Sequence, residues 1–386
     1  MVKVSLLSFV RHDTRWQEML SQTPRVSAIV AARNAAPTLA RCLDGLLAQA
    51  TDEVELIVVD DHSTDETRAI SSRYPVTLIE LPQHAGVSAA RNRGAEAAGG
   101  EVLFFLDADV VLAPGGMRRV FATMSRPEVG ALFGSYDADP DDVSIVSRFK
   151  NLAHHYFHQH SQLEATTFWS ACGAVRRECF FAAGGFDEKR FKLPSIEDVE
   201  LGYRLNDGGV RIVLDPELQV KHLKKWNLAS LVVTDVVRRA IPWTLLWMEH
   251  GRAQTDLNFS YGQRFAAMAS VALLPAIPVA LVSPYIWFVV GALLVVAYWL
   301  NRGLFRLLLT KGGLRLAIGG FLLQQLYYLY SMIGLAMGSA IYFFARSHAI
   351  RFSRSSRAEL CRTVSDTDHF DIHPVDQTAK GGQVGP

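Results

Sequence analysis

The stretch that most constrains this chain is Glu101–Leu112, which has the sequence EVLFFLDADVVL. Its apolar residues Val102 to Leu106 do not alternate with polar ones, which predicts a strand buried on both faces of a parallel sheet. The run ends in Asp107 and Asp109. Ligands of open α/β sheets bind beyond the carboxyl ends of the strands, and two carboxylates there can converge on one hard divalent cation and a bound ligand. Taken alone, a D-x-D pair fits a plain polar turn equally well.

Composition divides the chain into two parts. The 39 Lys and Arg residues nearly balance the 38 Asp and Glu residues, so no global basic field points to nucleic acid as a partner. Residues 266–300 and 316–345 contain no charged side chain, and each run exceeds the roughly 20 residues that cross a bilayer. The sequence therefore predicts a soluble domain followed by a membrane-embedded region.

The cysteines indicate the compartment. Cys42, Cys172, Cys179 and Cys361 show no C-x-x-C spacing, so neither a zinc site nor a disulfide framework is expected, and a reducing compartment suits them. The N-terminal extension, residues 1–25, has too short an apolar stretch for a signal peptide. We therefore expect the soluble domain to stay in the cytoplasm.

Strands alternate with helices up to the organising stretch. Apolar runs predict strands over residues 26–32, 54–59 and 76–81, and helical patterns cover 39–47 and 86–98. This alternation predicts an α/β fold with a doubly wound sheet. No G-x-G-x-x-G follows the first strand and no G-x-x-x-x-G-K-[ST] occurs, so phosphates, if bound, must be held by a metal and side chains.

Four segments carry a family resemblance. They are Val26–Asn34, the sequence VVDDHSTD over 58–65, GVSAARNRG over 86–94, and Phe104–Asp109. In order and spacing they resemble the motifs of family 2 glycosyltransferases with the GT-A fold, a doubly wound mixed sheet. The family has a glycine where this chain has His62.

Two later segments extend the resemblance. ACGAVRR over 171–177 and GGFDE over 184–188 look like the family's acceptor-side segment, which includes Gly173. SIEDVELGYRL over 195–205 resembles the family's E-D-x-E-L-x-x-R-L helix, which carries the catalytic base. The resemblance implies a GT-A domain over residues 26–225 that transfers a sugar from a nucleotide-diphosphate donor.

Such a transfer needs the leaving diphosphate to be neutralised, and Mg²⁺ or Mn²⁺ would supply that charge. We expect Asp109 to bind the ion directly. Asp107 would hold the ribose or a metal-bound water. His222, which follows a strand near the basic residues 221, 224 and 225, is a further candidate ligand, although a lone histidine is more often structural.

The resemblance also implies the donor site. Asp61 and Ala31 would contact the base, with Asp60 beside them at the end of the second strand, and Arg91 would lie near the diphosphate. A solvated surface charge is the alternative for Arg91. The cluster of histidines at 154, 155, 158 and 160 has no carboxylate or cysteine in step, so we expect part of an acceptor-side or interfacial helix there and no metal site.

Asp198 is the candidate general base, with Glu197 beside it to orient it. Asp198 starts a helix whose dipole lowers its pKa, so partial burial must oppose that effect. A phosphate acceptor is already ionised and needs no base, whereas a hydroxyl does. The pair therefore favours a hydroxyl on a lipid, a lipid-linked sugar or a glycan, with inversion at the anomeric carbon. A capping carboxylate pair is the alternative.

Residues 226–263 are expected to form interfacial helices. The paired arginines and tryptophans of 236–247 suit the headgroup region. Arg239 and Trp243 are the nearest match to the Q-x-x-R-W motif of processive family members, and we expect them on the acceptor side. The spacing differs and the glutamine is missing, which argues against processivity.

The transmembrane region, residues 264–345, is expected to hold two helices that turn near Ser283-Pro284 and a third over 316–345. The loop 301–315 and the tail 346–362 are both basic. They cannot both be cytoplasmic if one helix separates them, so the positive-inside rule conflicts with three full spans. Either one segment is re-entrant or interfacial, or the tail is exceptional. The tail, 346–386, is expected to end in disorder.

The sequence thus favours a multi-pass protein of the cell (inner) membrane with a cytoplasmic, metal-dependent, inverting glycosyltransferase domain. Its partners would be a nucleotide-sugar donor, a lipid or lipid-linked acceptor and the membrane, with no nucleic acid. Two alternatives stay open: a polyprenyl-phosphate glycosyltransferase, and a non-catalytic membrane scaffold that retains the fold. A transporter is disfavoured because the charge-free segments are few.

Overall fold

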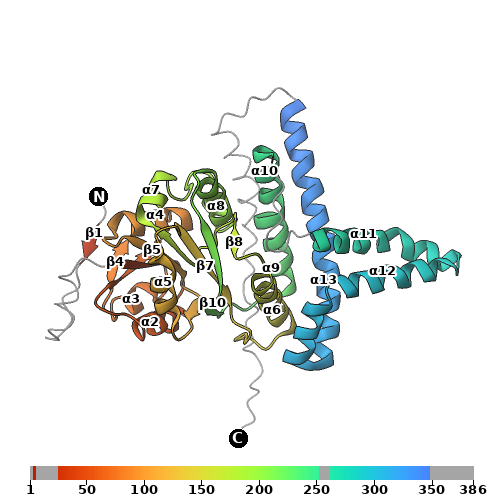
Figure 1. Ribbon diagram of the computed structural model, residues 1–386, viewed down its shortest axis with the longest axis horizontal. Coiled ribbons are helices and arrows are strands. Elements are labelled where there is room, and N and C mark those ends of the chain that lie inside the picture. The colour runs from red at the N-terminus through yellow and green to blue at the C-terminus, as the bar shows by residue number, and fades with distance from the viewer. Residues whose placement is uncertain (1–2, 6–24, 252–260, 348–386) are drawn as a thin grey trace, which may run out of the picture.

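A twisted mixed sheet, helices on both of its faces and a projecting helical hairpin make up the computed structural model of this chain (Figure 1). The structure describes residues 3–5, 25–251 and 261–347. The predicted order, a doubly wound mixed α/β sheet followed by C-terminal helices, is confirmed. The disorder expected near the C-terminus lies outside the described residues.

The first half of the sheet is parallel. Its strands pair in the order β4-β3-β2-β5, with the short strand β1 antiparallel on the edge next to β4. These strands are β1 (Lys3–Ser5), β2 (Val26–Ala32), β3 (Val54–Asp60), β4 (Thr77–Glu80) and β5 (Val102–Asp107). The connecting helices are α2 (Leu39–Leu47), α3 (Thr67–Ser71) and α4 (Val87–Ala97).

The second half of the sheet mixes directions. Strand β9 lies antiparallel between β5 and β7, and β10 runs parallel to β7 and antiparallel to β6. The strands are β6 (Val110–Leu112), β7 (Ala131–Tyr136), β8 (Glu164–Ala165), β9 (Cys172–Arg176) and β10 (Ile212–His222). Helices α5 (Gly116–Met124), α7 (Arg177–Ala182) and α8 (Glu197–Asp207) complete this half. Because β6 pairs back onto β10, His222 lies opposite Val110, next to Asp109.

Strand β5 is buried on both faces, as predicted. Phe104 belongs to one hydrophobic cluster, with Val30 and Val58, and is fully buried. Phe105 belongs to the cluster on the other face, where its ring lies 5.4 Å from that of Phe180. Two cores therefore flank the strand that ends at Asp107.

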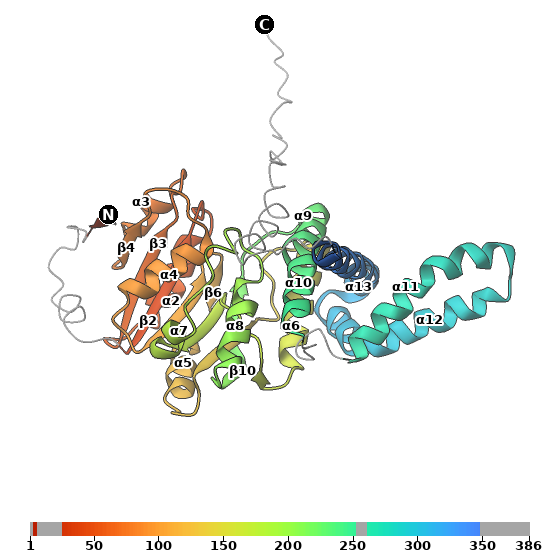
Figure 2. The same cartoon turned by 90° about the horizontal axis from the view of Figure 1, so that it is seen from above.

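The remaining helices form a layer beside the sheet and a hairpin beyond it (Figure 2). They are α6 (Ile145–Gln159), α9 (Leu228–Val233), the π-helix η1 (Thr234–Ala240), α10 (Ile241–His250), α11 (Tyr261–Val282), α12 (Ile286–Leu300) and α13 (Arg302–Ser347). The predicted turn between two apolar helices near Ser283-Pro284 is confirmed. Among the described residues, α11 and α13 are long and apolar enough to cross a membrane, and α12 is a shorter apolar helix.

One prediction about this region is wrong. Residues 301–315 are expected to form a loop, but this stretch is helical from Arg302 onward, and the separate helix expected after it follows the kink at Gly313. The only break is a kink at Gly313, where the backbone takes φ 66° and ψ −168°. Leucines and Phe305, interleaved with the basic residues of this stretch, pack on α6, which favours the helix over a loop.

Candidate active site

Several predicted donor-site residues meet at the carboxyl edge of the parallel strands. Asp107 ends β5, and the pairing of β2 with β5 sets Ala31 directly beside it. Asp109 follows one residue later, before the chain turns into β6. Edges of this kind are where ligands bind in open α/β sheets.

Arg91 of α4 connects this edge to the candidate base. One guanidinium nitrogen donates to Asp107 Oδ1 at 2.7 Å and another to Glu197 Oε1 at 2.8 Å. The guanidinium also lies over the ring of Phe186, 5.4 Å from its centroid. Burial lowers the pKa of Arg91, but the charges of Asp107 and Glu197 outweigh it and raise that pKa. Arg91 therefore holds two protein carboxylates and is not a solvated surface charge, and its place near a diphosphate stays a prediction.

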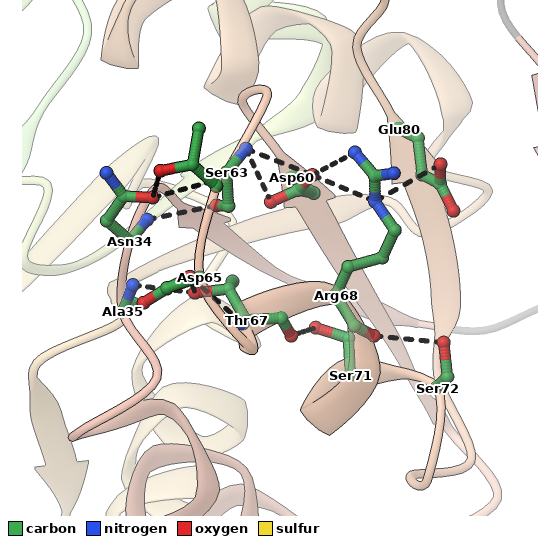
Figure 3. Close-up of polar contacts among 11 residues, drawn as sticks. Asn34, Ala35, Asp60, Ser63, Asp65, Thr67, Arg68, Ser71, Ser72 and Glu80 are labelled. Carbon is green, nitrogen blue, oxygen red and sulfur yellow. Dashed lines mark hydrogen bonds and ion pairs between the residues drawn. The ribbon is translucent and has the colours of Figure 1, made fainter.

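Asp60 is a structural residue of the second loop (Figure 3). It is fully buried, accepts a bond from the backbone N–H of Ser63 at 3.3 Å and pairs with Arg68 at 3.1 Å. Arg68 reaches on to Glu80 at 3.3 Å. The carboxylate has no exposed surface to offer a donor, so the binding role predicted for Asp60 is replaced by a role in shaping the loop.

Side chains from the first loop fix the same segment (Figure 3). Asn34 accepts from the backbone of Thr64 at 2.9 Å, and its own N–H donates to Ser63 at 2.9 Å. Both Asn34 and His62 take left-handed backbone angles, with φ of 50° and 57°. His62, where the family carries a glycine, thus takes a left-handed conformation that glycine adopts without strain.

Asp61 shapes the entrance to α4. Its carboxylate accepts the backbone N–H groups of Ala85 at 2.7 Å and Gly86 at 3.0 Å, and lies 2.7 Å from the His84 ring. Gly86 has φ 95°, and an added Cβ would lie 2.0 Å from the carbonyl oxygen of Lys192. Asp61 therefore positions a loop that approaches the segment leading into α8.

Asp198 lies in the first turn of α8 with a perturbed pKa. Burial and the neighbouring charge of Glu197 raise the pKa of Asp198 to about 6, against the opposing charge of Arg91. The backbone N–H and hydroxyl of Ser170 donate to one oxygen at 3.1 and 3.2 Å, and the N–H of Val199 donates to the other at 2.8 Å. The burial that the sequence reasoning required is thus present.

Glu197 does not orient Asp198 by direct contact. It is buried, and besides Arg91 it accepts the backbone N–H of Ser195 at 2.7 Å. Its effect on Asp198 is electrostatic, because two adjacent negative charges oppose each other's ionisation. Glu197 therefore raises the pKa of the candidate base and anchors the start of its helix.

Asp109 and His222 form the candidate metal centre. His222 Nε2 lies 3.6 Å from Asp109 Oδ2, and His222 Nδ1 lies 2.8 Å from the side-chain oxygen of Asn151. One ring nitrogen of His222 thus faces the Asp109 carboxylate while Asn151 holds the other, an arrangement typical of a histidine that a neighbouring side chain orients toward a cation. Among the described residues no three His, Cys, Asp or Glu side chains form a metal-binding group, so donor phosphates would have to complete the shell.

The two carboxylates of the D-x-D motif differ electrostatically. Burial raises the pKa of Asp107, and the nearby charge of Asp109 adds to this against Arg91. Burial also acts on Asp109, but the hydrogen bond and charge of His222, with the charge of Lys224, hold its pKa below the ordinary value. A hard cation binds the ionised form of a carboxylate, so this difference is compatible with Asp109 as the ligand, which stays a prediction.

Tyr136 was missed by the sequence reasoning. It ends β7, stacks on His222 with ring centroids 4.5 Å apart and lies 5.0 Å from the Trp169 ring. Burial raises its pKa, and the charges of Asp109, Asp107, Arg239 and Asp198 all act on it. The phenol therefore lies between the donor edge, the candidate base and the acceptor side. A single tyrosine after a strand gives no sequence signal of this.

The α6 histidines belong to an aromatic cluster. The His154 ring lies 4.5 Å from Tyr136 and 4.1 Å from His158, and His158 Nδ1 lies 2.9 Å from the carbonyl oxygen of Gly134. Burial keeps the pKa of both rings below the ordinary value. His154 packs on Tyr136, and Tyr136 in turn stacks on His222.

Of the three predicted acceptor-side residues, Gly173 does not reach a surface. It pairs with Phe105 and Phe133 in the middle of the sheet, and an added Cβ would lie 2.4 Å from the carbonyl oxygen of Trp169. Its predicted contact with an acceptor is therefore corrected to a packing role, set by the close approach of the loop before β9.

Arg239 and Trp243 line a cavity of about 360 Å³ between η1, α10, α11 and α13. Trp243 Nε1 donates to the hydroxyl of Tyr203 on α8 at 3.0 Å, which joins the cavity wall to the helix of Asp198. Most of the lining is apolar or aromatic, with Lys150, Asp235 and Arg264 as further charged residues.

A second pair in α8 also escaped the sequence reasoning. Arg204 binds Glu200 through two hydrogen bonds of 2.8 and 2.6 Å and donates to the carbonyl oxygen of Gly185 at 2.7 Å. The Glu and Arg of the E-D-x-E-L-x-x-R-L pattern thus fix the glycine turn against the base helix. They position the site without facing it.

Part of the chain is similar to known proteins. The model of glycosyl transferase family 2 matches residues 27–181. The O-antigen biosynthesis protein RfbC of Myxococcus xanthus is 33% identical over 222 residues, which cover 52% of this chain and 17% of that protein. The validoxylamine A glucosyltransferase of Streptomyces hygroscopicus subsp. jinggangensis is 30% identical over 254 residues, 55% of this chain and 60% of that protein.

A mannosyltransferase from Pyrobaculum calidifontis, solved with GDP-Man and Mn²⁺, aligns over 93% of this chain and 94% of its own at 18% identity, with a TM-score of 0.48. The chain spans less than two thirds of the length of the two curated relatives above. The family match rests on the segment that holds β2 to β5 and the D-x-D motif. Residues 27–181 of this chain match the model of glycosyl transferase family 2.

Proposed function

We propose that this protein is a membrane-anchored, inverting glycosyltransferase that moves a sugar from a nucleotide-diphosphate donor to a hydroxyl acceptor. The observation that carries the proposal is the pairing of a D-x-D edge with Asp198, whose pKa is raised to about 6. A carboxylate in that range is matched to general-base work near neutrality. The match to the glycosyl transferase family 2 model supports a nucleotide-diphosphate sugar as the donor. The raised pKa of Asp198 supports a hydroxyl as the acceptor.

On the donor side, Asp109 and His222 would hold a Mg²⁺ or Mn²⁺ ion, with Asp107 beside them. The ion would supply positive charge at the leaving diphosphate. Lys224 adds a cation there, since its charge acts on Asp109 and its ammonium lies over the Trp226 ring, 4.3 Å from the centroid. Ala31 and the loop shaped by Asp61 would border the nucleoside.

On the acceptor side, Asp198 would accept the proton of the attacking hydroxyl. Ser170 and Val199 hold its carboxylate through three hydrogen bonds, which fixes its orientation. Direct attack by that hydroxyl displaces the diphosphate from the opposite face of the sugar, so the product has the inverted anomeric configuration. Arg91 keeps the base helix in register with the donor edge.

The cavity beside Arg239 and Trp243 supports a lipid or lipid-linked acceptor. Its lining is largely apolar and it lies between α10 and the two apolar helices α11 and α13. Relatives named for O-antigen and succinoglycan biosynthesis agree with an acceptor in lipid-linked glycan or polysaccharide assembly. We place the catalytic domain on the cytoplasmic side of the cell membrane, where nucleotide sugars are.

The test is donor turnover by the full chain in lipid nanodiscs. A panel of nucleotide sugars is offered with Mn²⁺, with Mg²⁺ or with chelator, and Asp109→Ala is compared with the unsubstituted chain. We expect turnover of one donor that needs the ion, is lost in Asp109→Ala and gives a product of inverted configuration by nuclear magnetic resonance.

Two outcomes would contradict the proposal. A product that retains the anomeric configuration would exclude direct displacement by a hydroxyl. No turnover and no ion-dependent nucleotide binding with any donor would leave the non-catalytic scaffold as the better account.

A further inference from the structure

The two apolar helices long enough to cross a membrane differ in what they touch. Helices α11 and α12 pack mainly on each other and extend away from the catalytic domain (Figure 2). Leu281, Val282 and Phe288 of this hairpin are 74%, 84% and 80% exposed. Residues 266–300 carry no charge. An exposed surface this apolar and this large requires a hydrocarbon surrounding. A lipid bilayer provides it for both helices of the hairpin, α11 and α12.

Basic and aromatic residues gather at the other end of the hairpin. Arg264, near the start of α11, lies over the Tyr261 ring, 5.4 Å from its centroid. Arg302, just after α12, lies over the Trp299 ring at 4.6 Å. Arginine with tyrosine or tryptophan is typical of the membrane–water interface. The two arms of the hairpin therefore enter the bilayer from the same side.

Helix α13 is instead tied along its length to the catalytic layer. An added Cβ would lie 2.8 Å from Ile145 at Gly319, 2.4 Å from Ala240 at Gly334 and 2.7 Å from Thr244 at Gly338. These contacts run from α6 through η1 to α10. At 1.5 Å per residue, the part of α13 after Gly313 is about 50 Å long, well beyond a hydrocarbon core of about 30 Å.

The helices under α13 carry charges that a membrane span would bring into hydrocarbon. Lys150 of α6 pairs with the buried Asp235 of η1 at 2.7 Å, and Tyr330 of α13 donates to the same carboxylate at 2.7 Å. Arg148 donates to the backbone oxygen of Lys311. Charged side chains in the bilayer are costly unless they line a cavity or a bundle interior. Composition alone gives α13 the signature of a span, but its packing along α6, η1 and α10 favours a position beside the catalytic layer.

The direction of α13 relative to the α11–α12 hairpin fits a position of α13 on the membrane surface. In Figure 1 α13 runs across the base of the α11–α12 hairpin, and in Figure 2 it is seen nearly end on between the hairpin and the catalytic domain. If the hairpin points into the bilayer, α13 lies along the membrane surface. After Arg315 its exposed side chains, such as Ile318, Leu322 and Ile333, are apolar, as in helices that lie in the interface.

We propose that the chain enters the bilayer only through the α11–α12 hairpin and that α13 lies along the membrane surface on the side of the catalytic domain. Both ends of α13 then face that side. The basic segments 301–315 and 346–362 are both on it, so the conflict between the sequence and the positive-inside rule disappears. This arrangement replaces three full spans, and it does not depend on the transferase activity.

The test is labelling with a membrane-impermeant maleimide in right-side-out and inverted vesicles from cells that make the full chain. Cys42, Cys172 and Cys179 are replaced by Ala, which leaves Cys361, beyond α13, as one reporter. In two further variants Cys361 is replaced by Ser and either Glu66→Cys, exposed on the catalytic domain, or Gly291→Cys, in the middle of α12, is added.

We expect Cys361 and the Glu66→Cys variant to react in the same type of vesicle, and the Gly291→Cys variant to react only after detergent is added. Reaction of Cys361 in the opposite type of vesicle would show that α13 crosses the membrane. Reaction of the Gly291→Cys variant without detergent would show that the hairpin is not embedded. Either result overturns the proposal. Protease protection of the unsubstituted chain, with the tail cleaved from the same side as the catalytic domain, gives an independent check of the first point.

Discussion

Arg91 donates a hydrogen bond of 2.8 Å to Glu197 and so ties helix α4, on the donor side, to helix α8, which carries Asp198. The same guanidinium holds Asp107 at 2.7 Å. One buried cation therefore sets the distance between the D-x-D edge and the candidate base. The following predictions test this arrangement and its electrostatic consequences.

Replacing Arg91 should destabilise the catalytic domain. Arg91→Ala leaves Asp107 and Glu197 without their shared cation, and breaking a buried pair typically costs about 3–5 kcal/mol. Arg93→Ala is the matched control, since Arg93 lies on the same helix and pairs with the half-exposed Glu96 and Glu188, and pairs of this kind contribute about 0–1 kcal/mol. Thermal unfolding by circular dichroism should show a large drop for Arg91→Ala and almost none for Arg93→Ala. Equal drops would contradict the account.

The pH dependence of transfer should report Asp198. Its pKa is raised to about 6, and the base works only when ionised, so kcat/KM should fall as pH drops through about 6 and level off above it. The charge of Arg91 opposes that rise, so in Arg91→Ala the midpoint should move to higher pH. A pH profile measured for both proteins with saturating metal checks this. An unchanged midpoint would mean that another group controls the rate.

The orientation of His222 should matter for metal affinity. Asn151 holds His222 Nδ1 at 2.8 Å, and removing such a partner typically weakens metal binding about 10–100-fold. We expect Asn151→Ala to raise the Mn²⁺ concentration needed for nucleotide binding, and His222→Ala to raise it further. His160→Ala, at an exposed histidine on α6, is the control and should leave Mn²⁺ binding unchanged. Electron paramagnetic resonance of Mn²⁺ with a nucleoside diphosphate measures each, and equal affinity in all variants would remove His222 from the proposed shell.

Gly86 should tolerate no side chain. It combines φ 95° with the 2.0 Å approach to Lys192, whereas Gly209 has φ 77° and no atom within 4 Å of an added Cβ. Gly209→Ala should therefore cost only the left-handed backbone term, about 1–2 kcal/mol. Gly86→Ala should cost more and also impair nucleotide binding, because Asp61 holds the Gly86 N–H. Comparable stabilities for the two variants would show that the loop yields without consequence.

The sequence was sufficient wherever the signal is local. The unbroken apolar run of Val102–Leu106 predicted a strand buried on both faces, and the chain-order pattern of strands and helices predicted the sheet. The D-x-D pair and the Glu197-Asp198 helix start are short motifs whose position in the fold follows from their neighbours. The need for burial at Asp198 followed from the helix dipole alone.

The rest depends on contacts between distant segments. Arg91 and Glu197 are 106 positions apart, so nothing local distinguishes a buried bridge from a surface arginine. His222 reaches Asp109 only because β6 pairs antiparallel with β10. Tyr136 contacts His154 of α6, Trp169 before β9 and His222 of β10, which are all distant in sequence. For α13, composition is the same whether the helix crosses a membrane or lies on it, and only its packing on α6, η1 and α10 separates the two.

The measurement that tests the central claim most directly is sugar transfer by Asp198→Asn in lipid nanodiscs, with the donor and metal that support turnover in the unsubstituted chain. Asparagine keeps the size of the side chain but cannot accept the proton of a hydroxyl. We predict unchanged donor binding and a transfer rate lower by about 10²–10⁴-fold, the usual contribution of a general base. Transfer at the unsubstituted rate would contradict a base at Asp198 and would favour an acceptor that is already ionised, a polyprenyl phosphate.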